Sequence, residues 1–126
     1  MKINSSKLTN AFKSLRKAGF ITRQNFSCCG NCAGHALAAH IKGMTPSKRE
    51  RVKGAVFYTR QDVIAPVSWH PQHHIYIGYG PVSVSGMGTF GVSETEIAGA
   101  VVAALKAAGL EAEWDGNPTT KVLVNL

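Results

Sequence analysis

The first strong pattern in the chain is a helical repeat of apolar residues near its start. Leu8, Phe12 and Leu15 recur at the spacing i, i+4 and i+7, which places them on one face of a helix. The serine pair at 5–6 precedes the repeat and offers a capping hydroxyl, and Gly19 follows it where a helix commonly ends. We therefore predict an amphipathic first helix that ends at Gly19.

The rest of the chain alternates between strand and helix patterns. Ser27 precedes the second predicted helix as a cap, and Ser93 with Glu96 forms a capping box at the start of the third. In the segment before the third helix, Ile75, Ile77 and Tyr79 alternate with smaller or polar residues and give the sheet an apolar face. The predicted strands are 20–26, 54–60, 73–79, 110–115 and 120–125, and the predicted helices after the first are 29–41 and 93–108.

The order of these elements predicts an α+β fold with two layers in a single globular domain, 1–126. Without the first helix and the last strand the order is β-α-β-β-α-β, which is that of ferredoxin-like domains. The last strand adds a C-terminal hairpin. Right-handed crossovers would place the second and third helices on one face of the sheet. On the other face we expect Tyr58 and Arg60 beside His74 and Tyr76.

Two segments are predicted as loops. Residues 43–53 are polar and strongly basic, so we expect a mobile basic loop there. Residues 86–91 match the spacing G-x-G-x-x-G, but the helix that follows begins too late for a dinucleotide-binding motif. We therefore interpret this second segment as a flexible glycine-rich loop.

Basic and acidic side chains are divided unevenly along the chain. Residues 1–60 hold 12 Lys or Arg against Glu50 alone, a balance of +11, whereas residues 61–126 hold two basic and six acidic side chains, a balance of −4. The net charge of +7 thus comes from a basic half, 1–60, joined to an acidic half, 61–126. A field polarised in this way steers polyanions toward one part of the molecule.

The basic half favours a nucleic-acid partner. We predict a non-enzymatic nucleic-acid-binding protein, with DNA favoured over RNA. Its sequence specificity should be low, because no base-reading module is present. An acidic host protein as partner, or solvation alone, is the alternative interpretation of this charge. The side chains expected to contact phosphates or to stack on bases are Lys13, Arg16, Lys17, Arg23, Lys48, Arg49, Arg51, Lys53, Tyr58, Arg60 and Tyr76.

Composition narrows the class of protein further. Apolar residues make up 44% of the chain, and its uncharged stretches are too rich in Gly and Ser to span a bilayer. The start lacks the apolar stretch of a signal peptide, so we expect a cytoplasmic protein without a membrane partner. Its three cysteines are an odd number and are expected to be reduced. We expect no cofactor.

The cysteines Cys28, Cys29 and Cys32 lie together at the start of the second predicted helix. They allow a zinc site, with Cys29, Cys32 and His35 as ligands and His70, His73 or His74 as the fourth. They also allow a thiol-redox site, because a helix N-terminus stabilises the thiolate of a C-x-x-C motif. The third interpretation, which we favour at this point, is that they are small side chains that pack the helix against the sheet.

Two segments of the chain resemble a family of uncharacterised small bacterial domains. These segments are R-Q-N-F-S-C-C at 23–29 and A-L-K-A-A-G-L-E-A-E-W-D-G at 104–116, and the likeness extends from about residue 15 to residue 124. The small size and basic start are also similar to those of accessory proteins encoded by phages of actinobacteria, among which nucleic-acid binding is a common assignment. The family implies no reaction, so the resemblance supports the extent of the domain more than its function.

Overall fold

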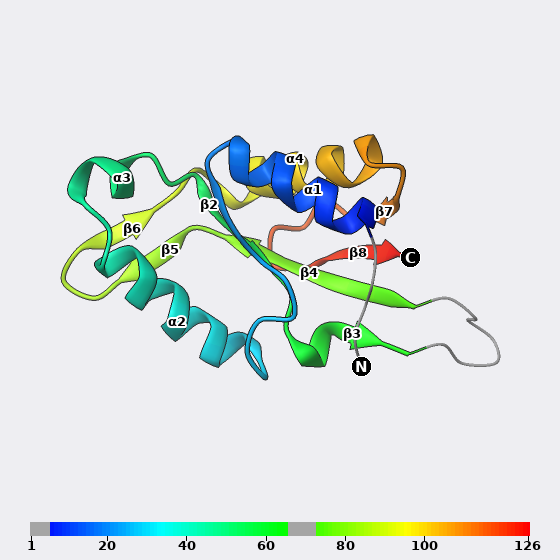
Figure 1. Ribbon diagram of the computed structural model, residues 1–126, viewed down its shortest axis with the longest axis horizontal. Helices are drawn as coiled ribbons and strands as arrows, with labels where there is room; N and C mark the ends of the chain where they lie inside the picture. Colours follow the sequence, from blue (N-terminus) through cyan, green and yellow to red (C-terminus); the bar gives the residue numbers. More distant parts are fainter. Residues whose placement is uncertain (1–5, 66–72) are drawn as a thin grey trace.

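The computed structural model describes residues 6–65 and 73–126, which form an α+β arrangement of helices on a mostly antiparallel sheet (Figure 1). His70 and the rest of 66–72 lie outside the described residues. In chain order the elements are α1 (Ser6–Lys17), β1 (Phe20–Arg23), α2 (Gly30–Lys42), α3 (Pro46–Glu50), β2 (Gly54–Phe57), the 3-10 helix η1 (Arg60–Asp62), β3 (Val63–Ile64), β4 (His74–Gly80), β5 (Val82–Val84), β6 (Gly88–Phe90), α4 (Glu94–Ala107), β7 (Glu111–Glu113) and β8 (Val122–Asn125).

The α+β class is confirmed, but the strand order is not that of a ferredoxin-like domain. The main sheet has the order β1-β2-β4-β8-β7, with β3 also paired to β4. A split βαβ unit holds another strand between its two parallel strands. Here β1 and β2 pair directly and in parallel, with Phe20 opposite Gly54, while the other pairs are antiparallel. The first strand therefore lies at the edge of the sheet.

The helices cover both faces of the sheet. In Figure 1, α1 and α4 lie together on one face and α2 lies on the other. The prediction that α2 and α4 share a face was wrong, because β1 and β2 bury side chains on both sides. Phe20 and Val56 enter the core under α1 and α4, whereas Ile21 and Ala55 pack with α2. A strand that is apolar on both faces needs a layer on each.

Tyr58 belongs to the core between α1 and the sheet, where it is 2% exposed. Its ring meets Phe12 edge to face at a centroid distance of 6.2 Å, and its hydroxyl donates to Gln24 Oε1. The prediction that Tyr58 stands on an open face beside Tyr76 was therefore wrong. Tyr58 follows Val56 by two positions, so it continues the buried side of β2.

At the start of α4, the half of the predicted capping box in which the Ser93 hydroxyl accepts from the helix is confirmed. The Ser93 hydroxyl accepts from the amide of Glu96 at 3.3 Å and also bonds the Glu96 carboxylate. The predicted C-terminal hairpin forms from β7 and β8, and in its turn Asp115 Oδ1 accepts from the Asn117 amide at 2.9 Å.

Three local predictions need correction. Ser27 does not cap α2, because its φ is +65° and Cys29 occupies the capping position. The segment 43–53, expected to be a loop, contains the short helix α3, which begins with Pro46 at its first position. The glycine-rich segment forms the β5–β6 hairpin, because Val82 and Val84 bury their side chains beside α2.

Candidate metal centre

A tight turn between β1 and α2 carries the first cysteine back toward the start of the helix. Asn25 and Ser27 both have a positive φ, +47° and +65°, which few residues other than glycine adopt. Hydrogen bonds to the β2–η1 segment hold this turn: the Phe26 amide donates to the Tyr58 carbonyl at 2.9 Å, and the Arg60 amide to the Ser27 carbonyl at 3.3 Å. The loop that bears Cys28 is therefore fixed from both sides of its turn.

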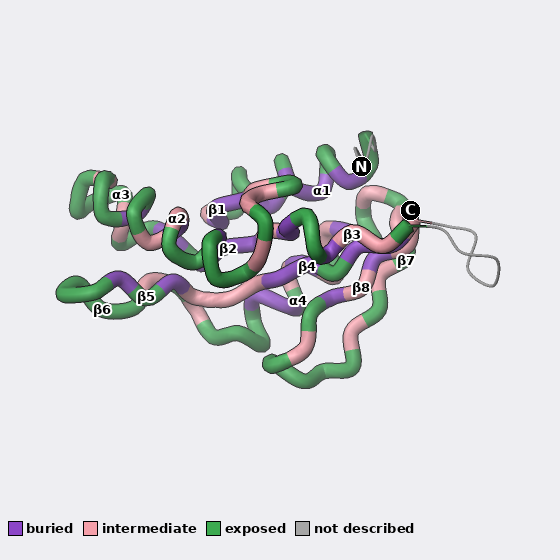
Figure 2. The backbone as a smooth tube through the Cα atoms, turned by 90° about the horizontal axis from the view of Figure 1, so that it is seen from below, coloured by how far each residue is buried: buried purple, intermediate pink, exposed green. Residues whose placement is uncertain are grey.

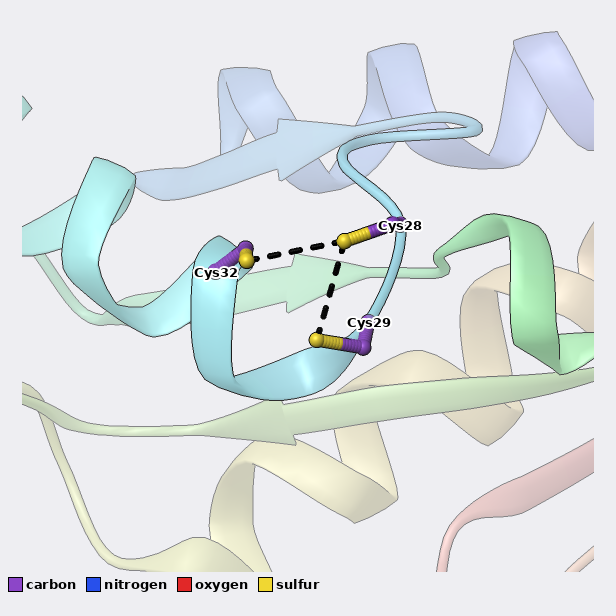
Figure 3. Close-up of side chains that lie close together, drawn as sticks. All are labelled: Cys28, Cys29 and Cys32. Atoms are coloured by element: carbon purple, nitrogen blue, oxygen red, sulfur yellow. Dashed lines mark hydrogen bonds between the residues drawn. The ribbon is translucent and has the colours of Figure 1, made fainter.

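Three sulfur atoms converge at the N-terminus of α2 (Figure 3). Cys28 comes from the loop, Cys29 caps the helix, and Cys32 lies in its first turn. The Cys28 Sγ lies 3.8 Å from the Cys29 Sγ and 3.5 Å from the Cys32 Sγ, and all three sulfurs lie within 4.8 Å of one another. Cys28 and Cys32 are exposed and Cys29 is half-buried, so these thiols do not pack the helix against the sheet.

The neighbouring groups shift the acidity of two of these thiols in opposite directions. The amide of Cys32, helped by the thiols of Cys28 and Cys32, lowers the pKa of Cys29 although no full capping hydrogen bond forms there. Hydrogen bonds to the sulfur atoms of Cys28 and Cys29, together with their charge, raise the pKa of Cys32 to about 11. Cys29 is therefore the thiolate that the N-terminus of α2 stabilises.

This asymmetry predicts the order in which the metal-free, reduced protein reacts with iodoacetamide. At pH 8 Cys29 should be alkylated at least about tenfold faster than Cys32, because the thiolate is the reacting species. Raising the pH toward 11 deprotonates Cys32 and should narrow the difference. Quenched time points, digestion and mass spectrometry give both rates. Faster labelling of Cys32 at pH 8 would contradict this assignment.

The histidines that the structure describes do not join the cysteines. Within 6–65 and 73–126, the group whose side chains lie close enough to share a metal ion consists of the three cysteines alone. His35 lies in α2 and lines a groove between that helix and the sheet. His74 is the first residue of β4 and pairs with Asn125 of β8. The geometry therefore favours Cys28, Cys29 and Cys32 as a ligand set over the alternative set of Cys29, Cys32 and His35.

A groove of about 550 Å³ opens beside the cysteine cluster. It lies between α2 and the sheet, and Gly30 and Asn31, which directly follow Cys29, form part of its wall. His35, Phe57 and Gly80 line it further along. The cluster is thus open to solvent and also adjoins a cavity large enough for a small ligand.

The residues that we expected to contact nucleic acid divide into two sets. The first set consists of exposed cations on the C-terminal half of α1 and on the segment that runs from α3 into β2. These two segments meet where the Lys53 amide donates to the Gly19 carbonyl at 2.9 Å. We call this set the basic surface; its members are Lys13, Lys17, Lys48, Arg51 and Lys53. Figure 2 shows α3 as exposed along most of its length.

The other cations and aromatics of that expectation lie elsewhere or are held by the fold. Arg49 is half-buried and donates twice to the Met44 carbonyl, at 2.8 and 3.1 Å. Arg23 donates to the Thr22 carbonyl, and Arg16 bonds the Thr22 hydroxyl. Three further members are separate from the basic surface: Tyr58 in the core, Arg60 in η1 and Tyr76 on β4, which is 39% exposed.

A family model covers residues 2–126, and thus the whole of the fold and the cysteine cluster described above. The chain belongs to the family DUF6891. The description of DUF6891 is a domain of unknown function, which agrees with the resemblance to an uncharacterised family. No curated protein and no solved structure matches the chain.

One class of helix is missing from the part of this DUF6891 domain that the structure describes. None of the helices in 6–65 and 73–126 combines the length and the apolar character needed to cross a bilayer. The longest, α4, has 14 residues, fewer than the roughly 20 that a spanning helix requires.

Proposed function

We propose that the domain binds a zinc ion through the thiolates of Cys28, Cys29 and Cys32. The observation that carries this proposal is the convergence of the three sulfurs to within 4.8 Å of one another. Zinc binds thiolate sulfur at about 2.3 Å, so neighbouring sulfurs of a tetrahedral site lie about 3.8 Å apart. The separations of 3.8 and 3.5 Å from Cys28 match that edge, and an ion needs only small side-chain movements to bind.

The chemistry of the donor set supports the same ion. Thiolates are soft ligands that select zinc or copper(I) over magnesium and calcium. The positive end of α2 and the lowered pKa of Cys29 favour a first thiolate, and a bound cation would stabilise the other two. Three protein ligands leave the fourth coordination position to water, which the exposure of Cys28 and Cys32 admits.

Titration of the reduced, metal-free protein with cobalt(II) tests this proposal. We expect one cobalt ion per chain, with the charge-transfer absorption of thiolate ligands, and stoichiometric displacement of cobalt by zinc. Cys28→Ser, Cys29→Ser and Cys32→Ser should each lower the zinc affinity by more than about 100-fold, since even lost outer-shell partners cost up to that factor. His35→Ala, a matched change one turn further along α2, should alter the affinity less than about threefold.

Two results would overturn the zinc proposal. The first is cobalt binding without thiolate absorption, or a Cys28→Ser variant that binds zinc as the wild type does. The second is absence of metal binding together with rapid formation of a disulfide between Cys28 or Cys29 and Cys32 in glutathione buffer, which would make the cluster a dithiol redox site instead. Circular dichroism of each metal-free variant separates ligand loss from misfolding.

A further inference from the structure

The basic surface, formed by Lys13, Lys17, Lys48, Arg51 and Lys53, brings together two segments that are distant in sequence. Lys13 and Lys17 lie at i and i+4 on α1, and the other three come from α3 and the chain that follows it. The Lys53 amide bonds Gly19, just after α1, and the Lys53 side chain packs against the same glycine. The end of α1 and the segment between α3 and β2 are therefore in direct contact, which brings cations of both segments to one junction.

Acidic side chains do not neutralise this surface. Across 6–65 and 73–126, the ion pair that forms is between Lys121 and Asp62, neither of which belongs to the basic surface. Glu50 is the single acidic residue among the first 60 residues. Glu50 is exposed in α3 between Lys48 and Arg51 and offsets only part of their charge, so the surface keeps a net positive charge that attracts a polyanion from solution.

Helix stability explains only part of this clustering. Cations in the last turn of a helix interact favourably with its dipole, which accounts for Lys17 in α1 and Lys48 in α3. Lys13 lies before the last turn of α1, and Lys53 lies outside both helices. The helix dipole therefore does not account for these two cations, which extend the surface beyond the last turns of the two helices.

We propose that the basic surface binds the phosphate backbone of nucleic acid. Residues four apart on a helix are about 6 Å from each other, a spacing suited to neighbouring phosphates of one strand. The contacts are with phosphates, so affinity is strongly dependent on salt and weakly dependent on sequence. This site is separate from the cysteine cluster, and its test does not depend on zinc.

The experiment is fluorescence anisotropy of the full chain with labelled duplex DNA, single-stranded DNA and RNA of unrelated sequences, from 50 to 200 mM salt. Five phosphate contacts predict a log–log slope of about −4.5 on duplex DNA, which is roughly a 500-fold loss of affinity over that range. The triple variant Lys17→Glu, Arg51→Glu, Lys53→Glu should bind at least about 30-fold more weakly at 50 mM salt, with a slope flatter by about 2.7.

The matched control is Lys106→Glu, which reverses one exposed charge in the last turn of α4 and away from the basic surface. It should change affinity less than about twofold, whereas Lys17→Glu alone should weaken binding about fivefold or more. Circular dichroism shows whether the variants fold. If the triple variant does not fold, the milder double variant Lys17→Gln, Lys53→Gln replaces it. Equal weakening by both single variants, or no binding at 50 mM salt to any of the three nucleic acids, overturns the proposal.

Discussion

Replacing Gly54 by alanine should destabilise the protein by about 3–5 kcal/mol and lower its melting temperature by about 10–20 °C. Gly54 is buried at the start of β2 with a φ of +147°, a region open to glycine alone. A Cβ added there would lie 2.5 Å from Ile97 Cδ1 and 3.0 Å from the Gly80 carbonyl oxygen. Backbone strain and overpacking between β2, α4 and β4 therefore add together.

The control for this prediction is Gly99→Ala, which should have the opposite sign. Gly99 is exposed within α4, and a Cβ there would meet no atom within 4 Å. Alanine favours the helix over glycine, so we expect a gain of about 0.5–1 kcal/mol. Urea unfolding of both variants measures the two changes. A Gly54→Ala variant as stable as the wild type would show that β2 can shift away from α4.

Elements with a local signal were predictable from the sequence. The Ser93 cap fixes where α4 begins, and the repeat of Leu8, Phe12 and Leu15 fixes which face of α1 is buried. The turn of the last hairpin is likewise local, since Asp115 and Asn117 bond within it. In each case the residues that decide the structure are close neighbours in the chain.

The strand order was not predictable in this way, because it depends on contacts between distant segments. The short strands β1 and β2 have apolar residues at consecutive positions, which shows burial but not which helix covers which face. The β5–β6 hairpin adds to the layer around α2 and completes that second face. Its pattern of Gly86, Gly88 and Gly91 resembles a loop, so its two buried valines gave a weak signal.

The candidate metal centre was half visible in the sequence. Because α2 begins just after Cys29, Cys32 lies in its first turn. The spacing of these two cysteines in the sequence was enough to predict this. The position of Cys28 depends on the left-handed backbone conformations of Asn25 and Ser27. Neither residue is a glycine, so the sequence did not indicate this turn. The sequence identified the cations of the basic surface but not which of them lie near one another. That depends on the contact between Gly19 and Lys53.

Asp62 is the last residue of η1 and connects the fold to the cysteine loop. The helix η1 holds that loop in place through the bond from the Arg60 amide to Ser27. Its Oδ2 accepts from the Thr59 amide at 2.8 Å and from the Thr59 hydroxyl at 3.0 Å, and its Oδ1 pairs with Lys121. Thr59 is 1% exposed and Asp62 is 6% exposed, so water cannot replace these bonds. The next amide, that of Arg60, bonds Ser27 beside Cys28.

Asp62→Ala should therefore destabilise the protein by about 3–5 kcal/mol, since it leaves two buried donors of Thr59 without an acceptor. Lys121→Gln should cost less, about 1–2 kcal/mol, because the Lys121 side chain is 45% exposed and the Asp62 carboxylate keeps its bonds to Thr59. Urea unfolding measures both losses, and hydrogen exchange at the Thr59 and Arg60 amides should accelerate in Asp62→Ala alone. If the lysine variant lost as much stability as the aspartate variant, the ion pair would be the stabilising interaction instead of the bonds to Thr59. The larger loss at Asp62 would show that the cysteine loop is held by buried hydrogen bonds within the β2–η1 segment.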